Sequence, residues 1–483
     1  MDLSKLLMSL IQILVILGLA VCIGAFTQGK VRLWAIFLLS LLSVYIFQPL
    51  VPLRNFDYWF PSASIALTLL VWFAVRRQED TLDRESIIAG ALGCSVILIV
   101  AFVRFIPFEI PWFPTAAPRF GHILIFLLTA LLVAALLGLR PGARPAGSWI
   151  VLITLLVLFV LIKTETSALW LSERIRTLQG QSISLASTVD LSWLGFSYVS
   201  FRLIHTLRDR QSGRLPSTNL REFTTYVLFF PALVAGPIDR IERFIEDLRE
   251  QKRLSGDRAL AAGARILIGL FKKFVLADGL ALLALSPNSA PLADSTGWTW
   301  VLLYAYAFRL FLDFSGYTDI AIGIGMLADI KMPENFDRPY LKSNMTAFWN
   351  SWHITLARWF RAYYFNPLTR WLRSGPLRNS PVFIVLIGQV STMVLIGLWH
   401  GFTWNFAIWG LWHGVGLFIH NRWVNFLRSN SRPALFDRLP GRAAQFLGVL
   451  LTFNFTAVGW VWFALPDVNM SIDILRLLLG PLG

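Results

Sequence analysis

Three of the six histidines in this 483-residue chain directly follow a tryptophan, and all three lie in or beside apolar sequence. The pairs are Trp352-His353, Trp399-His400 and Trp412-His413. An ionisable side chain at membrane depth is costly, so each of these histidines is a functional-site candidate. Imidazole has an unperturbed pKa of about 6.5, which suits proton transfer near neutral pH. The pattern predicts acid–base chemistry within or beside a lipid bilayer.

Hydropathy predicts the elements that hold these residues. Hydrophobic residues make up 56% of the chain, charged residues make up 15%, and the mean hydropathy is +0.62. Apolar runs long enough to span a bilayer occur at 6–26, 33–53, 87–103, 121–139, 149–162, 259–285, 298–327, 381–398, 403–419 and 443–465. Shorter or interrupted runs occur at 62–75, 191–207 and 223–237. We therefore expect an all-α polytopic protein of the cell membrane, with roughly ten to thirteen membrane helices, some of them broken or re-entrant.

The character of the sequence changes after residue 165. Before it lie plain apolar spans; from Asp190 onward, polar residues, glycines and prolines interrupt the apolar runs. Broken helices at membrane depth are tolerated where they line a protein cavity. We predict N-terminal transmembrane helices over 1–165, a catalytic core with re-entrant and interfacial helices over 166–430, and a C-terminal transmembrane helix and tail over 431–483.

The net charge of +15 is concentrated in two segments. Fourteen Lys and Arg lie between Arg202 and Lys273, and eight lie between Lys331 and Arg378. Such charge is typical of cytoplasmic loops and of contact with anionic membrane lipid. It also suits an anionic, phosphate-bearing donor or an acidic carrier protein. No nucleic-acid-binding module accompanies the charge, so we expect no nucleic-acid partner.

Residues 345–364 resolve as one amphipathic helix with aromatic residues on one face. Arg358 and Arg361 lie on the opposite face, and His353 lies at the edge of the aromatic stripe. This pattern predicts a helix in the plane of the membrane interface. His353 is then either a polar tip in an aromatic belt or a functional group.

His400 ends an almost entirely apolar run, and Gly397 and Gly401 beside it permit close backbone approach. It is either a base or a histidine hydrogen-bonded within helix packing. His413 and His420 share a helix face, but no carboxylate lies at a familiar ligand spacing. We therefore expect no metal and interpret these two histidines as structural or supporting.

Asp313 and Asp319 are carboxylates inside an apolar segment, hence costly unless paired. They could form a proton relay. The favoured interpretation is that they anchor a broken helix by bonding to backbone amides or to an arginine such as Arg309.

Several familiar catalytic and phosphate-binding motifs are absent from the sequence. There is no GxSxG elbow, no P-loop and no reactive-looking cysteine motif. His205 is followed by an aspartate four residues on, rather than the five of the soluble-type glycerolipid acyltransferases. A histidine-based site without a covalent nucleophile would most simply activate a substrate hydroxyl directly.

At these residues the chain resembles the membrane-bound O-acyltransferase (MBOAT) family, in particular the bacterial branch with alginate O-acetylation proteins and teichoic-acid D-alanyl transferases. The resemblance covers roughly residues 190–423 in four ordered blocks. The blocks read GFSYVSFRLIHTLRD, YVLFFPALVAGPIDRIERF, the long segment DFSGYTDIAIGIG through FWNSWHITLARWFR, and GLWHGFTWNFAIWGLWHG. Ser351 stands where this branch often has a basic residue.

The resemblance implies a helical funnel around a tunnel through the membrane. His400 would be the general base on the acceptor hydroxyl, and His353 would orient or polarise the donor carbonyl. The residues that would support these two or line the tunnel are Trp399, Trp352, Asn405, Asp313, Asp319, Asn335, Arg358 and Arg361.

The implied reaction moves an acetyl or D-alanyl group from a cytoplasmic coenzyme A or acyl-carrier-protein thioester to hydroxyls of an exported glycopolymer. No bound cofactor is expected. Membrane lipid, an acyl carrier protein, and a secreted or membrane-bound acyltransferase or esterase are the expected partners. A lipid or protein acceptor, and a proton-coupled transporter as a different class, remain alternatives.

Overall fold

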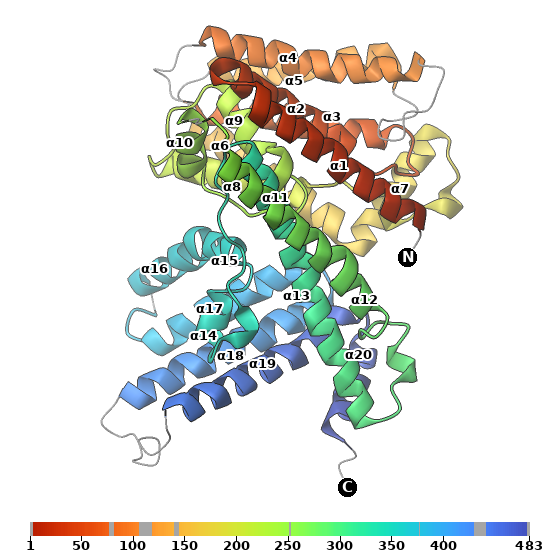
Figure 1. The fold of residues 1–483 in the computed structure, drawn as a ribbon. Helices are drawn as coiled ribbons and strands as arrows, with labels where there is room; N and C mark the ends of the chain where they lie inside the picture. Colours follow the sequence, from red (N-terminus) through yellow and green to blue (C-terminus); the bar gives the residue numbers. More distant parts are fainter. Residues whose placement is uncertain are drawn as a thin grey trace. The chain divides into compact units, whose positions relative to one another are not determined.

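The computed structural model describes residues 3–76, 82–105, 118–139, 144–250, 253–375, 377–428 and 441–480. Throughout these ranges the chain forms helices and connecting segments, without a strand (Figure 1). This confirms the predicted all-α polytopic class. Among the described residues, seven helices are long and apolar enough to cross a membrane, or eight if α6 and α7, bent by 92° at their junction, form one span. Ten spanning runs were expected from the sequence, and of these the helices in 6–26, 259–285 and 403–419 do not meet the criterion over the described residues, whereas the helix that contains 62–75 does.

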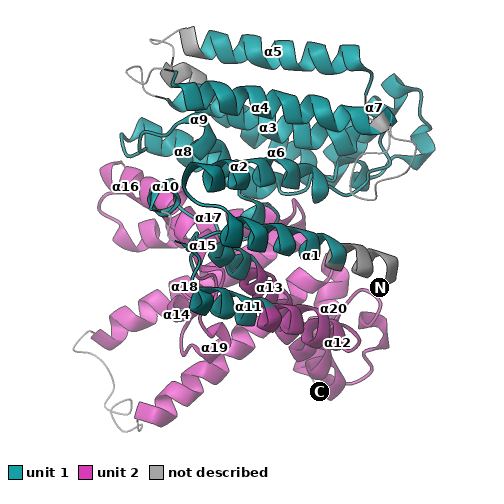
Figure 2. Cartoon of the chain, turned by 45° about the horizontal axis from the view of Figure 1, so that its top comes forward, with its two compact units in different colours: residues 1–266, 321–333 teal, residues 267–320, 334–483 magenta. Residues whose placement is uncertain are grey.

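The chain divides into two compact units (Figure 2). Unit 1 comprises Met1–Ile266 and Ala321–Pro333, and unit 2 comprises Leu267–Ile320 and Glu334–Gly483. The helices α11 and α13 each contribute residues to both units. The predicted boundaries at 165 and 430 describe stretches of sequence, whereas the compact units are interleaved along the chain.

The helices that begin in unit 1 are α1 (Leu3–Phe26), α2 (Gly29–Ile46), α3 (Phe56–Val75), α4 (Arg84–Ala101), α5 (Phe120–Leu139), α6 (Arg144–Lys163), α7 (Glu165–Gln179), α8 (Phe196–Gln211), α9 (Leu220–Val227), α10 (Ile241–Arg249) and α11 (Gly256–Leu270). Those that begin in unit 2 are α12 (Asp278–Ala281), α13 (Thr296–Leu327), α14 (Met345–Trp349), α15 (Ile354–Phe360), α16 (Asn366–Ser374), α17 (Pro381–His400), α18 (Trp404–Arg428), α19 (Gly441–Ala464) and α20 (Val468–Leu479).

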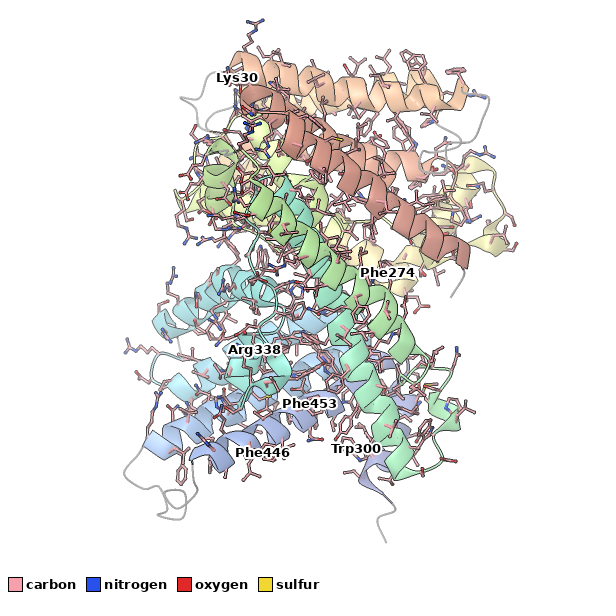
Figure 3. The ribbon with its side chains drawn as sticks, in the orientation of Figure 1. Lys30, Phe274, Trp300, Arg338, Phe446 and Phe453 are labelled. Atoms are coloured by element: carbon pink, nitrogen blue, oxygen red, sulfur yellow. The ribbon has the colours of Figure 1, made fainter. Side chains whose placement is uncertain are left out.

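Helix α3 is the centre of unit 1. It contacts α2, α4, α5, α6, α8 and α9, and 67% of its most apolar window is buried. Its sequence predicted only a short segment over 62–75, but the helix begins at Phe56, and Asp57 and Tyr58 of its first turn are buried. Lys30, at the start of α2 (labelled in Figure 3), is exposed, and its Nζ lies 3.4 Å from Oε1 of Glu85 on α4.

Side-chain caps set the helix starts where the sequence supplies them. Asp83 accepts a hydrogen bond from the backbone N–H of Ser86 at the start of α4. Asn219 and Glu222 form a reciprocal capping box on α9. Each such cap satisfies a backbone donor that a helix start leaves without an intrahelical partner. A cap also starts α20, which the sequence analysis did not predict, where Asp467 accepts from Asn469 and Met470.

Helices α17 and α18 form a hairpin in unit 2, and α19 packs beside it. Helix α17 packs along α18, and α18 packs along α19 (Figure 1). A Cβ on Gly397 would overlap the carbonyl oxygen of Phe406, and one on Gly414 would lie 2.7 Å from the Cα of Val390. Glycine is therefore what lets the two helix backbones approach so closely.

Candidate active site

His400 is the last residue of α17, at the turn into α18. Its half-buried imidazole lies 4.5 Å from the ring of Trp399, 4.8 Å from Phe463 and 5.9 Å from Phe406, measured between ring centroids. Trp409 adds an edge-on contact at 5.7 Å. The end of the helix thus places His400 among aromatic rings.

His353 immediately precedes α15 and has the left-handed backbone conformation, with φ 42°. This conformation costs a non-glycine residue roughly 1–2 kcal/mol. The backbone carbonyl of Asn335 stabilises it by accepting from the N–H of Ile354 at 3.0 Å. The imidazole is 3% exposed, and its Nδ1 lies 3.1 Å from Oδ1 of Asn335.

The two histidines contact the same side chain. The ring of His353 lies 6.2 Å from that of Trp399 and 4.7 Å from that of Phe314, and Trp399 also contacts His400. The structure thus gathers His353, His400 and Asn335 in one unit, although 47 residues separate the two histidines.

The environment of His353 keeps its imidazole neutral. Burial lowers the pKa of His353 to about 3. Within the described ranges, its Nε2 is buried and has no hydrogen-bond partner. A neutral imidazole with one unoccupied nitrogen is what a substrate-binding or proton-accepting histidine requires.

The single amphipathic helix predicted over 345–364 is wrong. The structure has α14, a turn through His353, α15, and then a π-helical segment, Arg361–Phe365. The side-chain oxygen of Asn335 accepts from the N–H of Thr355 at 3.2 Å, so this amide bonds outside the helix ladder. The break removes His353 from the aromatic stripe and turns it into the interior.

Asp313 and Asp319 have lysine partners rather than the expected backbone amides or Arg309. Lys272 Nζ lies 2.7 Å from Asp319 Oδ2, and Lys273 pairs with Asp313. Both lysines belong to the π-helical segment Phe271–Ala277. The expected break in the aspartate-bearing helix is also wrong, since α13 runs unbroken over 32 residues.

Two other candidate residues hold the scaffold in place. Trp352 is buried against Phe336, Phe348 and Trp460. Asn405 donates to the carbonyl of Leu465 at 2.7 Å and to Ser471 Oγ at 3.0 Å. Asn405 thereby fastens the start of α18 to the segment that joins α19 to α20, one turn after His400.

The two arginine candidates are exposed, and one of them borders a cavity. Arg361 donates to Oδ1 of Asn350 at 2.8 Å and lines a cavity of about 270 Å³. The other lining residues are Thr346, Trp349, Ala357, Phe365, Gln389, Thr392, Met393, Ile396 and Leu417. Two polar atoms in this wall, Nε1 of Trp349 and Oε1 of Gln389, are buried without a hydrogen-bond partner among the described residues. Arg358 does not line it.

His413 and His420 take up separate positions on α18. His413 is fully buried and packs on Trp349, Trp409 and Trp460. His420 Nδ1 lies 2.9 Å from Thr346 Oγ1.

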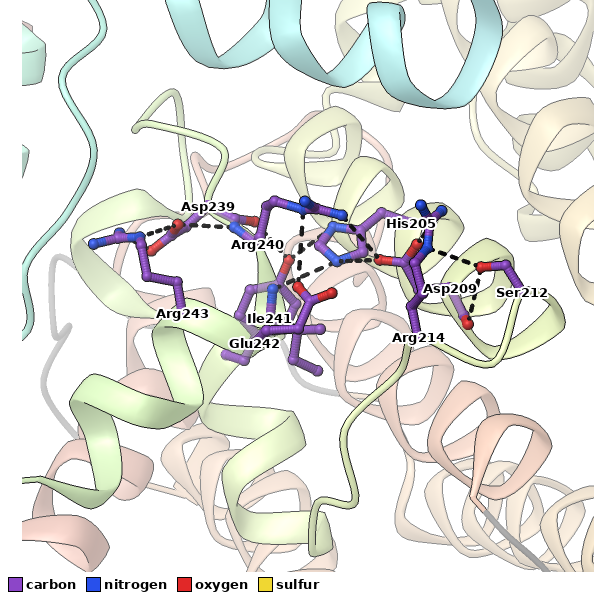
Figure 4. A network of polar contacts seen from close by, with 10 residues as sticks. His205, Asp209, Ser212, Arg214, Asp239, Arg240, Ile241, Glu242 and Arg243 are labelled. Carbon is purple, nitrogen blue, oxygen red and sulfur yellow. Dashed lines mark hydrogen bonds and ion pairs between the residues drawn. The ribbon is translucent and has the colours of Figure 1, made fainter. Parts of the chain in front are cut away.

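A polar network around His205 in unit 1 was missed by the sequence analysis (Figure 4). His205 Nε2 lies 3.4 Å from Asp209 Oδ2, and its Nδ1 lies 3.2 Å from the hydroxyl of Tyr226. Arg214 lies 3.1 Å from the other oxygen of Asp209. Burial lowers the pKa of His205 to about 4, against the opposing effect of the Asp209 carboxylate. The spacing of four residues on α8 was the available signal.

This network has the donor set of a metal site but also its own counter-charges. The ligand atoms of His205, Asp209 and Glu242 all lie within 4.8 Å of one another. Arg240 lies 4.0 Å from Asp209 and 3.8 Å from Glu242, and Arg214 pairs with Asp209. Two guanidinium groups therefore balance the two carboxylates, and we interpret the network as structural.

Comparison with known proteins places this site in a family. Residues 147–462 match the membrane-bound O-acyltransferase family. The chain is 33% identical to a teichoic acid D-alanyltransferase of Streptococcus thermophilus, over 57% of this chain and 68% of the relative. It is 32% identical to a probable alginate O-acetylase of Pseudomonas aeruginosa (69% and 62%) and 31% identical to a peptidoglycan O-acetyltransferase of Helicobacter pylori (66% and 60%).

The match spans about half to two thirds of the length of these curated relatives. The family match over residues 147–462 includes all three Trp-His pairs, Asn335, and the helices α13 to α18. By the extent of this match, the chain belongs to the membrane-bound O-acyltransferase family.

Proposed function

We propose that this protein transfers an acetyl or D-alanyl group from a cytoplasmic thioester donor to hydroxyls of an exported cell-envelope glycopolymer. The observation that carries the proposal is the pair His353 and His400 on the indole of Trp399, within the family-matched region. The relatives are named for acylation of teichoic acid, alginate and peptidoglycan, which supports a polymer acceptor over a lipid or a protein.

His400 is the general base in this proposal. Its imidazole takes the proton of the acceptor hydroxyl as the oxygen attacks the thioester carbonyl carbon. The carbon–sulfur bond then breaks, and the imidazolium returns the proton to the leaving thiolate, so that thioester and alcohol become ester and thiol. Alignment of the two substrates and base catalysis supply the rate, and no covalent enzyme intermediate is needed.

The cavity beside Arg361 is the proposed place of the donor's anionic arm. The guanidinium of Arg361 is exposed at the cavity wall, and Nε1 of Trp349 and Oε1 of Gln389, on two other lining residues, are buried without a hydrogen-bond partner among the described residues. Coenzyme A and carrier-protein thioesters both carry a phosphate and several amide groups. A planar, permanently charged guanidinium suits the phosphate, and Arg358 lies nearby in sequence on α15.

The expected partners follow from the same chemistry. An acidic acyl carrier protein would meet the basic segments, membrane lipid surrounds the spans, and a secreted or membrane-bound acyltransferase or esterase would continue the modification outside. We propose that the protein lies in the cell membrane (plasma or inner membrane) of a bacterium. The pairing of Asp313 and Asp319 with lysines favours an enzyme over a proton-coupled transporter, since paired carboxylates are already compensated.

A transfer assay with the purified protein in lipid nanodiscs tests this function. Acetyl-coenzyme A, an acetylated carrier protein and a D-alanylated carrier protein are supplied in turn, with soluble fragments of alginate, teichoic acid or peptidoglycan as acceptor. We expect thiol release that requires both an acceptor and one of these donors, and an alkali-labile ester on the acceptor. Thiol release that is the same without acceptor, or no ester in any combination, would contradict the proposal.

A further inference from the structure

Asn335 contacts both the imidazole of His353 and the backbone that follows it. It is fully buried in the segment that follows α13. Its backbone oxygen accepts from Ile354, and its Oδ1 faces three groups: the N–H of Thr355 at 3.2 Å, the hydroxyl of Thr355 at 2.9 Å and Nδ1 of His353 at 3.1 Å. One amide side chain thus contacts both sides of the turn at His353.

The chemistry of these partners decides which amide atom faces them. The backbone N–H of Thr355 can only donate, so the Asn335 atom that it contacts must be the oxygen. Nδ2 of Asn335 is buried without a hydrogen-bond partner among the described residues, and with the amide reversed the N–H of Thr355 would lose its acceptor as well. The orientation of Asn335 therefore follows from the hydrogen bonds rather than from the placement of its two similar terminal atoms.

The same oxygen decides the tautomer of the imidazole. Nδ1 of His353 contacts an oxygen that is an acceptor, so Nδ1 must carry the proton. A neutral imidazole has one N–H, which leaves Nε2 with a lone pair and no proton. That nitrogen is buried and without a hydrogen-bond partner in the described part of the chain. Burial, which lowers the pKa of His353 to about 3, disfavours a second proton.

We propose that Asn335 is a positioning residue that holds His353 in the Nδ1–H tautomer, so that Nε2 accepts a hydrogen bond from an N–H or O–H of a substrate. Nε2 in this state has no proton to give to a carbonyl oxygen. Of the two roles that the family resemblance offers, His353 therefore orients a substrate and does not polarise the donor carbonyl. This inference rests on the proposed acyl transfer.

The group that binds Nε2 is a hydrogen-bond donor, and either of the two substrates can supply it. This group is either an amide N–H in the pantetheine arm of the thioester or a hydroxyl of the acceptor. Accepting the bond from either aligns the reacting groups without a second proton transfer, which leaves proton removal to His400.

The first test observes the tautomer itself, independently of activity. The wild-type protein is labelled with ¹⁵N-histidine, reconstituted in lipid nanodiscs and studied by solid-state NMR near pH 7. Six histidines contribute signals, and a His353→Gln sample identifies the pair from His353. We expect a neutral ring with Nδ1 protonated and Nε2 unprotonated. A ring protonated at Nε2, or at both nitrogens, overturns the inference even if the protein proves to be an acyltransferase.

The second test changes the protonation of His353 with a substitution that replaces one NH₂ group by an oxygen. Asn335→Asp keeps an oxygen against Nδ1 but adds a negative charge, which raises the pKa of the imidazole and favours a proton on Nε2. If Nε2 must accept, activity of the variant is lost on the acidic side and recovered as pH rises. Protonation of His353, followed by the same ¹⁵N signals, should then occur about 1–3 pH units higher in the variant than in the wild type. If Nε2 must donate, the variant is instead most active on the acidic side, which overturns the inference.

Asn344→Asp is the matched control, with the same charge change on the same segment. Asn344 caps α14 by accepting from Ala347, and aspartate caps helices as well as asparagine does, so this variant should keep the wild-type pH profile. KM values in the acidic limb of Asn335→Asp identify the ligand: a raised KM for the thioester alone indicates the pantetheine amide, and a raised KM for the polymer alone indicates the hydroxyl. Should Asn335→Asp fail to fold, the NMR measurement on the wild type still decides.

Discussion

His353 and His400 differ in their surroundings although both contact the indole of Trp399. His353 is almost fully buried and bonded to Asn335, whereas His400 is half-buried at a helix end among aromatic rings. Titratable groups in different environments take different roles in a reaction. This contrast underlies the assignment of proton removal to His400 and substrate orientation to His353.

His400→Ala should abolish acyl transfer, because the variant lacks the proposed base for the hydroxyl proton. Loss of general-base catalysis lowers kcat by about 10²- to 10⁴-fold. Initial rates in nanodiscs measure the effect, with membrane abundance checked by immunoblot and expected near normal. The control is His122→Ala, since His122 lies exposed on α5. A His400→Ala enzyme of wild-type rate would refute the general-base assignment.

His353→Ala should also be severely impaired, because it removes the substrate contact and leaves the amide oxygen of Asn335 with one partner fewer. The two effects are separable by thermal unfolding in the same nanodiscs. We expect the unfolding midpoint to change little relative to the loss of activity. Activity that falls only in proportion to the folded fraction would indicate a structural histidine.

Arg361→Gln should raise the KM for the thioester by about tenfold, as expected when a charge-assisted hydrogen bond of about 1.4 kcal/mol is lost. Arg358→Gln should have a smaller effect of the same kind, since Arg358 does not line the cavity. Arg476→Gln, on the exposed side of α20, is the control. Steady-state kinetics would contradict the donor role if KM stayed constant while kcat fell.

At the scale of single residues, the sequence alone indicated both histidines, because a histidine beside a tryptophan in an apolar run is a local pattern. It did not identify the contact from Asn335, which comes from an irregular segment 18 residues before His353. Nor did it find the lysine partners of Asp313 and Asp319, which lie 40 and 47 residues away in the chain. Local spacing carries no information on such pairings.

At the scale of elements, the helix predicted over 345–364 shows what periodicity leaves out. Aromatic residues do recur at helical spacing in this segment. The periodicity of hydrophobic residues, however, carries no information on the backbone hydrogen bonds that end a helix. Asn335 supplies a carbonyl and a side-chain oxygen to the N–H groups of Ile354 and Thr355, and these bonds accompany the left-handed turn at His353. Glycine positions were more informative, since Gly397 was expected to allow close approach and does so.

Gly397→Ala should disturb the hairpin of α17 and α18 and displace His400. The added Cβ would overlap the carbonyl oxygen of Phe406, and overpacking of this kind costs roughly 1–3 kcal/mol. We expect a lower thermal midpoint together with reduced transfer. Gly263→Ala on α11, where a Cβ would meet nothing within 4 Å, should be neutral or stabilising. Equal behaviour of the two variants would contradict the close packing of the hairpin.

Arg176→Leu should destabilise unit 1 strongly, because it leaves Asp190 as an unpaired buried carboxylate. The guanidinium contacts both carboxylate oxygens, at 2.6 and 2.9 Å, and Ser172 adds a third bond. Breaking a buried pair costs about 3–5 kcal/mol. The double variant Arg176→Leu/Asp190→Leu should recover much of this loss in chemical unfolding. A double variant less stable than Arg176→Leu alone would show that the pair is not coupled in this way.

At the scale of the whole molecule, the sequence predicted the fold class because spanning helices follow directly from apolar length. The division into two interleaved compact units could not be predicted from the sequence, since α11 and α13 each contribute residues to both units. Which helices pair depends on long-range packing, as between α17 and α18, and hydropathy does not report this.

The concentration of positive charge is also a property of the whole chain. It suits retention of basic segments on the cytoplasmic side and attraction of an acidic carrier protein or an anionic thioester. Attraction of that kind is screened by salt. The KM for a carrier-protein donor should therefore rise as ionic strength is raised from low to physiological values, and kcat should stay nearly constant. A KM independent of salt would argue against a charge-guided donor.

The central claim, acylation of an envelope polymer by His400, is tested most directly by an analysis of ester-linked acyl groups in the cell envelope. Cells that carry the wild-type protein are compared with cells that carry His400→Ala at matched membrane abundance. Mild base releases the acyl groups from each envelope fraction, and mass spectrometry identifies them. The proposed function predicts an acetyl or D-alanyl species that is present with the wild type and lost with the variant, in a glycopolymer fraction. Identical ester content in the two strains, in cells shown to make such polymers, would contradict it.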